Sequence, residues 1–152
     1  MILDSLVANL ETILTQITDS HLKRYDYLQR TLRCSDVASD VRFRLTFNGY
    51  YRMQRRPQHW YELYCSVLER EKLNQSVTFD DVFLEIFRTT HRVEPSFCSK
   101  LVATIRPEMP VYDSYVRDNL SLNIPRPHQP RETRLQGFLR AYSFLKKPSL
   151  VY

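Results

Sequence analysis

The sequence of 152 residues contains only two glycines, Gly49 and Gly137. Tight turns between strands often need a backbone conformation with positive φ, which glycine adopts most readily. A fold with many hairpins would therefore need more glycines than this chain has. Apolar residues make up 43% of the sequence, enough for a hydrophobic core. These features favour helices joined by loops that the eight prolines mark, and they predict an all-α fold.

The length predicts one domain. We expect residues 1–152 to form a single compact orthogonal helical domain of about seven helices, with a proline-rich loop at 121–131 before the C-terminal helix. Apolar residues that recur at steps of three and four mark one face of each helix. By this criterion we predict helices at about residues 2–17, 20–32, 57–68, 79–87, 95–105, 114–120 and 132–146.

Several helix boundaries have a local chemical signal. Asp19 or Ser20 can cap the helix that reaches Leu32. Thr78 with Asp81 three residues later resembles a capping box. Proline is tolerated in the first turn of a helix and stops one from within, so we expect residues 57 and 95 to mark helix starts and residue 107 a helix end.

Residues 41–53 fit two secondary structures. Val41, Phe43, Leu45 and Phe47 alternate with polar residues as in a strand, and Asn48-Gly49 could form a hairpin turn. The aromatic residues of the same segment also fall on one helical face. No partner strand is evident elsewhere in the sequence, so we favour a helix here.

The basic residues gather in two segments. Residues 41–57 hold five arginines and no acidic residue, and residues 121–152 hold six basic residues against one acidic residue, so each segment carries +5. Residues 1–40 carry −2, from four basic and six acidic residues, and residues 58–120 carry −3, from seven and ten. The two basic segments could form one nucleic-acid face, which would require them to meet in space. Alternatively, these arginines could pair with the acidic middle of the same chain.

The first basic segment interleaves arginines with aromatic residues. Guanidinium groups can neutralise phosphate and aromatic rings can stack on bases. We expect Arg52, Arg55 and Arg56 to be exposed cations that contact nucleic acid, and Phe43 and Phe47 to belong to the core.

The stretch from Arg92 to Leu120 contains a proline-bounded loop followed by Pro-Val-Tyr-Asp-Ser-Tyr-Val at a predicted helix start. It resembles the core of the helix-hairpin-helix DNA glycosylase superfamily, the group that includes endonuclease III and oxoguanine glycosylase. The stretch is also similar to a group of uncharacterised bacterial proteins. The glycosylase resemblance implies a helix-hairpin-helix-like element near residues 79–120. It also implies a DNA partner, with base excision as the activity if the chain is an enzyme.

In that family an aspartate at this helix start stabilises the cationic sugar or activates a nucleophile. The resemblance places that aspartate at Asp113, whereas a simpler interpretation is that Asp113 caps the helix. It also implies that Arg92 and Lys100 contact phosphate. The turn from Thr90 to Pro95 lacks the family's glycines, and Lys100 lies thirteen residues before the aspartate instead of about twenty, so we do not expect it to form a Schiff base.

Other classes of protein have no signal in the sequence. There is no apolar run of 18 residues, and the N-terminus has Asp4 and no cationic lead-in, so we expect neither a membrane span nor a signal peptide. The three cysteines fit core thiols in a reducing compartment. We therefore expect a cytoplasmic protein with no metal and no cofactor. The alternative function is a non-enzymatic module that binds another protein, for which the amphipathic C-terminal helix is the candidate surface.

Overall fold

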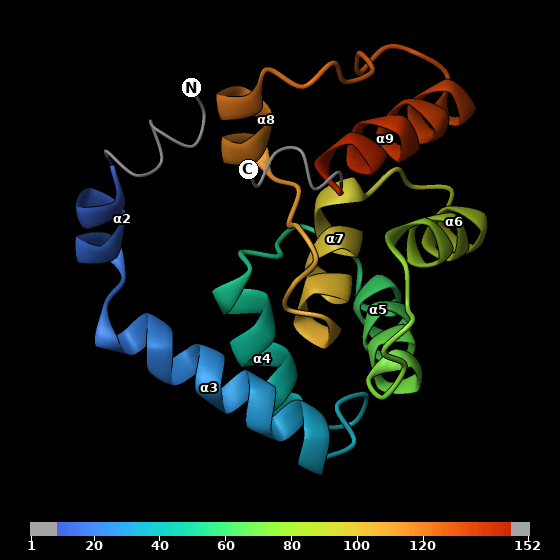
Figure 1. Cartoon of the computed structure of the whole chain (residues 1–152). Helices are drawn as coiled ribbons and strands as arrows, with labels where there is room; N and C mark the ends of the chain where they lie inside the picture. The colour runs from blue at the N-terminus through green and yellow to red at the C-terminus, as the bar shows by residue number, and fades with distance from the viewer. Residues whose placement is uncertain (1–8, 147–152) are drawn as a thin grey trace.

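The computed structural model describes residues 9–146, and this part of the chain contains eight α-helices and no strand (Figure 1). The prediction of an all-α fold is confirmed. The predicted residues 2–8 of the first helix lie outside the described range. The helices are α2 (Leu10–Gln16), α3 (Asp19–Cys34), α4 (Val41–Tyr50), α5 (Gln58–Glu71), α6 (Phe79–Thr90), α7 (Pro95–Ile105), α8 (Ser114–Leu120) and α9 (Arg131–Leu145).

Helix α3 begins one residue earlier than the sequence signal indicated. Thr18 is the N-cap, and its hydroxyl accepts a hydrogen bond from the backbone N–H of His21 (3.3 Å). The prediction of Asp19 or Ser20 as the cap was wrong, because the residue before them offers an equivalent hydroxyl. At α6 Thr78 is the N-cap, and its side chain accepts from the backbone N–H of Asp81. The predicted capping box is only half formed, because the Asp81 carboxylate accepts from the Thr78 hydroxyl (2.6 Å) and not from the Thr78 backbone N–H.

Residues 41–50 form helix α4 and not a hairpin. Asp40 caps the helix by accepting a hydrogen bond from the backbone N–H of Phe43 (2.9 Å). Phe43 and Phe47 lie one turn apart, and both are buried against the core. The helix thus buries both aromatic rings on one side, which supports the helical interpretation over the strand, and Gly49 lies in the last turn.

Helix α7 is the central element of the fold (Figure 1). It packs against α6, and nearly every residue from Cys98 to Ile105 is buried. Ser99 provides internal hydrogen bonds, accepting from the backbone N–H of Tyr112 at 2.9 Å. The core thus surrounds α7.

The C-terminal helix α9 uses its apolar face inside the domain. Leu135, Phe138 and Tyr142 are buried, and the Tyr142 ring stacks on Phe79 with centroids 3.8 Å apart. The Tyr142 hydroxyl donates to the carbonyl of Pro110 (2.8 Å). Because these contacts occupy its apolar face, α9 is not the open helix that the protein-binding alternative required.

Candidate nucleic-acid interface

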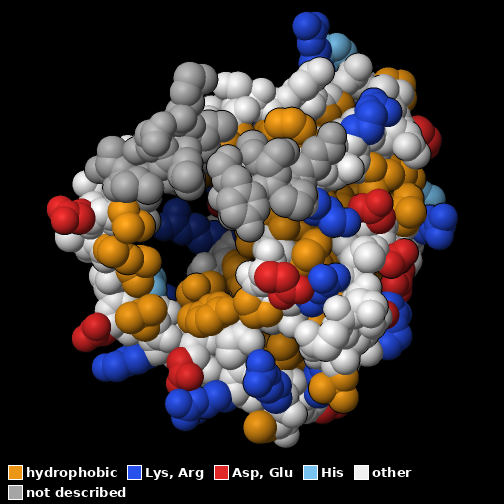
Figure 2. Space-filling model, in the orientation of Figure 1, with side chains coloured by type: hydrophobic (Ala, Val, Ile, Leu, Met, Phe, Trp, Pro, Cys, Tyr) orange, Lys and Arg blue, Asp and Glu red, His pale blue; other side chains and the backbone are white. Residues whose placement is uncertain are grey.

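Two adjoining concavities lie between α3 and α4, which pack against each other. Their volumes are about 760 and 530 Å³, and both are lined by Arg24 and Gly49. In Figure 2 a hollow opens between α2 and the C-terminal end of α4, and Lys or Arg side chains are visible deep inside it. We call the two concavities together the α3–α4 basic surface, whose cations are Lys23, Arg24, Arg42 and Arg52.

The spacing of residues on the two helices explains why these cations gather. Each helix contributes residues at steps of three, one and three, which fall on one side of a helix. The buried residues of α3 and α4, such as Leu28 and Phe43, lie on the opposite sides of these helices, so the face with the cations points outward. The contributing residues are Ser20, Lys23, Arg24 and Tyr27 from α3 and Arg42, Leu45, Thr46 and Gly49 from α4.

The surface combines positive charge with aromatic rings. The guanidinium of Arg42 lies over the Tyr27 ring, 5.0 Å from its centroid, and the rings of Tyr25 and Tyr50 are 6.1 Å apart. None of the described residues that line either concavity is acidic. At Gly49 a Cβ would meet no atom within 4 Å, so the floor is open. The arrangement can neutralise phosphate groups and offers ring faces for stacking.

Arg52 links this surface to the segment that resembles the glycosylases. Its charge lowers the pKa of Lys100, and the charge of Asp113 raises that pKa, so both lie near the lysine. Burial of the half-exposed lysine is the largest effect, and the net result is a lowered pKa. The Lys100 ammonium donates to the carbonyl of Tyr51 (3.0 Å) and lies over the Phe97 ring.

Asp113 is the N-cap of α8, as the capping interpretation predicted. Its Oδ1 accepts a hydrogen bond from the backbone N–H of Val116 at 2.9 Å, and the side chain is half-buried. Lys100 is its basic neighbour, but no hydrogen bond joins the two among the described contacts. The capping role is therefore present in the structure, and a catalytic role for Asp113 stays a prediction.

The remaining predicted cations lie elsewhere. Arg56 forms a two-point ion pair with Glu94, with Nε–Oε1 at 2.7 Å and Nη2–Oε2 at 2.8 Å, and the hydrogen bond to Glu94 raises its pKa. Arg55 and Arg92 are exposed. Arg56 and Arg92 line a separate pocket together with arginines of α9. The two basic segments of the sequence therefore do meet, but in a pocket that Asp113 does not line.

Sequence reasoning missed three of the four cations of the α3–α4 basic surface, Lys23, Arg24 and Arg42. Lys23 and Arg24 belong to the N-terminal segment 1–40, whose net charge is negative, so the segment as a whole gave no indication of a basic surface. Their spacing to Tyr27 was a usable signal, because it places a cation pair and an aromatic residue on one exposed helical face.

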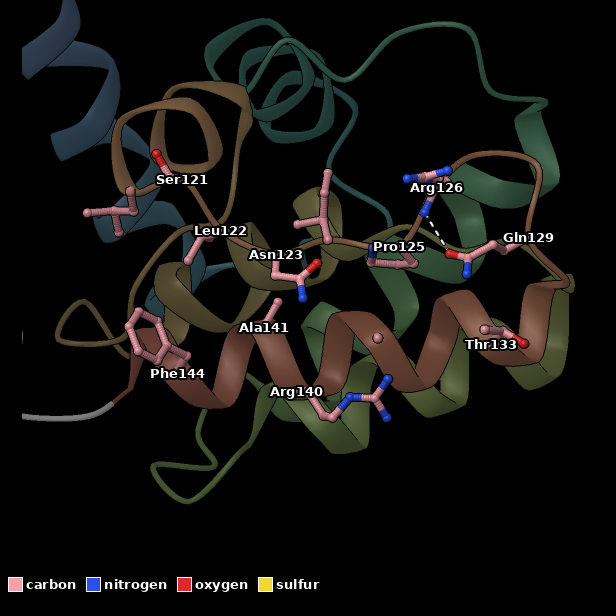
Figure 3. A pocket seen from close by; sticks show the side chains of 13 residues that line it. Ser121, Leu122, Asn123, Pro125, Arg126, Gln129, Thr133, Arg140, Ala141 and Phe144 are labelled. Carbon is pink, nitrogen blue, oxygen red and sulfur yellow. Dashed lines mark hydrogen bonds between the residues drawn. The ribbon is translucent and has the colours of Figure 1, made fainter.

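A third concavity, of about 600 Å³, lies between α9 and the loop that precedes it (Figure 3). Phe144 lies at one end, and Gln129 and Thr133 lie at the other. Gln129 accepts a hydrogen bond from the backbone N–H of Arg126 (2.7 Å), which holds the loop in shape. Arg126 and Arg140 are the charged side chains among its lining residues, half as many as on the α3–α4 basic surface, so it is a weaker candidate for a site.

Within residues 9–146, no group of three or more His, Cys, Asp or Glu side chains is placed to hold a metal ion. No helix of the same range is long and apolar enough to cross a membrane. Comparisons with protein-family models, with curated proteins and with solved structures found no match to this chain.

Proposed function

We propose that this chain is a DNA-interacting helical domain whose α3–α4 basic surface contacts the sugar–phosphate backbone. One observation carries the proposal: four cations line two adjoining concavities to which the described chain contributes no carboxylate. An arginine whose role is to form an ion pair within the protein lies beside an acidic residue. Arg70 is an example, with its Nη2 2.6 Å from Oε2 of Glu85. The α3–α4 cations have no such ion pair among the described contacts.

The proposal predicts a strong dependence of affinity on salt. Each phosphate that a cation neutralises releases condensed counterions, so the logarithm of the association constant falls with the logarithm of the salt concentration by about 0.9 per contact on duplex DNA. Lys23, Arg24 and Arg42 together would account for about three contacts.

The test is a fluorescence anisotropy titration of the full chain with a labelled duplex and the matching single strand, at several salt concentrations. We expect the triple variant K23Q/R24Q/R42Q to bind more weakly and to lose between two and three units of the salt slope. The control R33Q/R88Q/R140Q makes the same charge change at exposed arginines outside this surface, and we expect a smaller loss.

A second variant tests the shape of the surface without changing its charge. Gly49→Leu places a side chain on the open floor, where a Cβ has no neighbour within 4 Å. We expect weaker DNA binding without any loss of thermal stability, because leucine also favours the helix more than glycine does. Equal losses in the two triple variants, together with normal binding by Gly49→Leu, would show that net charge alone attracts DNA and would overturn the proposal.

The glycosylase resemblance extends the proposal to base excision. Asp113 would be the carboxylate of the reaction, and the lowered pKa of its neighbour Lys100 supports a site where ionisable groups are tuned. Arg52 would contact the strand beside it. Release of a damaged base from a duplex by the wild-type chain, and its loss in Asp113→Asn, would support this extension. If the wild-type protein releases no base, the proposed base excision is contradicted, and the DNA-binding proposal is unaffected.

The second candidate function is a protein-binding module, and α2 favours it. Leu10, Leu14 and Ile17 are 50, 55 and 45% exposed on this helix and the turn after it. Apolar side chains gathered on one helix are typical of a surface that another chain covers. Light scattering after size exclusion would test self-association, and L10S/L14S would remove it if α2 is the interface.

A further inference from the structure

A pocket of about 470 Å³ lies where the turn between α6 and α7 meets the start of α9. Four of its lining residues are arginines, and Val93 is the single apolar residue among those described. We call it the arginine pocket, defined by Arg56, Arg92, Arg131 and Arg134. It lies apart from the α3–α4 basic surface, with which it shares no lining residue.

The pocket has an excess of positive charge that the protein itself does not balance. Glu94 is its one lining carboxylate, and both oxygens are taken by Arg56 at 2.7 and 2.8 Å. Arg92, Arg131 and Arg134 have no ion pair within the described chain. Three arginines therefore line one pocket without a carboxylate paired to them, and an anion bound there would offset their mutual repulsion.

One donor in the pocket lacks an acceptor. The Nε of Arg134 is buried and has no hydrogen-bond partner. Buried donors are nearly always paired, so the described chain leaves this one available to an acceptor such as a water molecule or a bound anion. Helix α9 begins at Arg131, and its N-cap residue Pro130 has no side-chain cap, so the first N–H groups of the helix add positive potential near Arg131.

We propose that the arginine pocket binds a phosphate-type oxyanion, either the free ion or the terminal phosphate of a larger molecule. Arg92 and Arg131 supply charge from the two sides of the pocket, and Arg134 supplies the buried donor. The Arg56–Glu94 ion pair forms one wall of the pocket, and Arg56 is held there by both Glu94 and the Phe97 ring, whose centroid is 5.0 Å away. Guanidinium groups suit this role because they donate two parallel hydrogen bonds to phosphate oxygens.

The test is isothermal titration calorimetry of the full chain with inorganic phosphate at constant ionic strength, with chloride as the reference anion. We expect phosphate to bind and at least a tenfold weaker affinity in R92Q/R131Q, which changes only exposed residues and should fold normally. Arg88→Gln, an exposed arginine on α6 outside the pocket, is the control and should bind as the wild type does. Equal affinity in R92Q/R131Q and the control, or heat no greater than with chloride, would overturn the proposal.

Two further ligands identify the source of the phosphate. An oligonucleotide with a 5′-phosphate is compared with the same strand lacking it. A preference for the phosphorylated strand that R92Q/R131Q loses and K23Q/R24Q/R42Q keeps assigns the pocket to a terminal phosphate. Inorganic phosphate binding without that preference assigns it to the free ion. Both results stand apart from the DNA-binding proposal, which K23Q/R24Q/R42Q tests.

Discussion

At the scale of single residues, the turn between α4 and α5 places two arginines in the left-handed region of backbone conformation. Arg52 has φ 53° and Arg55 has φ 61°. Residues with a Cβ pay roughly 1–2 kcal/mol there, a cost that glycine avoids. The turn thus holds two exposed cations at positions where glycine would be the more stable choice.

This geometry predicts different stabilities for two variants of Arg55. Arg55→Ala keeps the Cβ and its strain, whereas Arg55→Gly relieves it, so we expect the glycine variant to be more stable than the alanine variant by about 1 kcal/mol. Urea unfolding followed by circular dichroism measures the difference. An alanine variant as stable as the glycine variant would mean that the turn relaxes out of the left-handed region.

Asp113 allows its two suggested roles to be separated by one carboxylate-to-amide change. Asparagine caps a helix about as well as aspartate, so the free energy of unfolding of Asp113→Asn should lie within about 0.5 kcal/mol of the wild-type value. Asp113→Ala loses the bond to Val116 and should be about 1 kcal/mol less stable. Thermal unfolding checks both values. A large loss of stability in Asp113→Asn would show that the negative charge itself matters to the fold, through Lys100 or the helix dipole.

At the scale of elements, the two glycines predict a contrasting pair of variants. Gly49 faces open space in α4, whereas a Cβ at Gly137 in α9 would lie 2.9 Å from Cγ of Pro125. Gly49→Ala should stabilise the protein by about 0.5–1 kcal/mol through helix propensity. Gly137→Ala should destabilise it by about 1–3 kcal/mol, because the proline ring must shift. Chemical unfolding of both variants measures the two changes in stability. Stabilisation of both variants would show that the loop before α9 is not held against the helix.

The helices were predictable because their signals are local. Apolar spacing and the Thr78 cap define α6 without reference to the rest of the fold. Segment 41–53 was ambiguous because a strand and a helix can bury the same aromatic residues, and only the partners available in space decide between them. Gly137 shows what the sequence alone does not reveal. A lone glycine within a helical pattern suggests a locally unstable helix, but here glycine is required because Pro125 approaches the helix closely, and that contact depends on the tertiary fold.

At the scale of the whole molecule, the sequence predicted the cations but not their grouping. Arg52 and Arg55 are exposed as expected, whereas Arg56, which we also expected to be exposed, is half-buried and held by Glu94, 38 residues away. Such pairing depends on how α7 packs against the turn before α5, which no local pattern encodes. The same packing brings the two basic segments together at the arginine pocket and leaves Asp113 beside Lys100.

The buried thiols and phenols of the core make the whole molecule sensitive to alkaline pH. Burial raises the pKa of Cys65 to about 11 and of Tyr51 to about 12, and it raises the pKa values of Cys98, Tyr64 and Tyr142 as well. In the unfolded chain cysteine ionises near 8.5 and tyrosine near 10. Above these values the unfolded state loses protons that the folded state keeps, so the stabilisation is complete below about pH 8 and declines as the pH rises.

We therefore expect the free energy of unfolding to decrease from about pH 8.5 upward and more steeply above pH 10. Each unit of raised pKa corresponds to about 1.4 kcal/mol. Lys100 acts in the opposite direction, because its lowered pKa favours the folded state as the pH approaches 10.5, but it is a single group against the several cysteines and tyrosines whose pKa values are raised. Urea unfolding at pH 7, 9 and 10.5 measures the trend, and Tyr51→Phe should make the decline above pH 10 shallower. Equal stability at pH 7 and 10.5 would mean that these groups reach solvent in the folded protein, and the core around α7 would then be looser than its packing indicates.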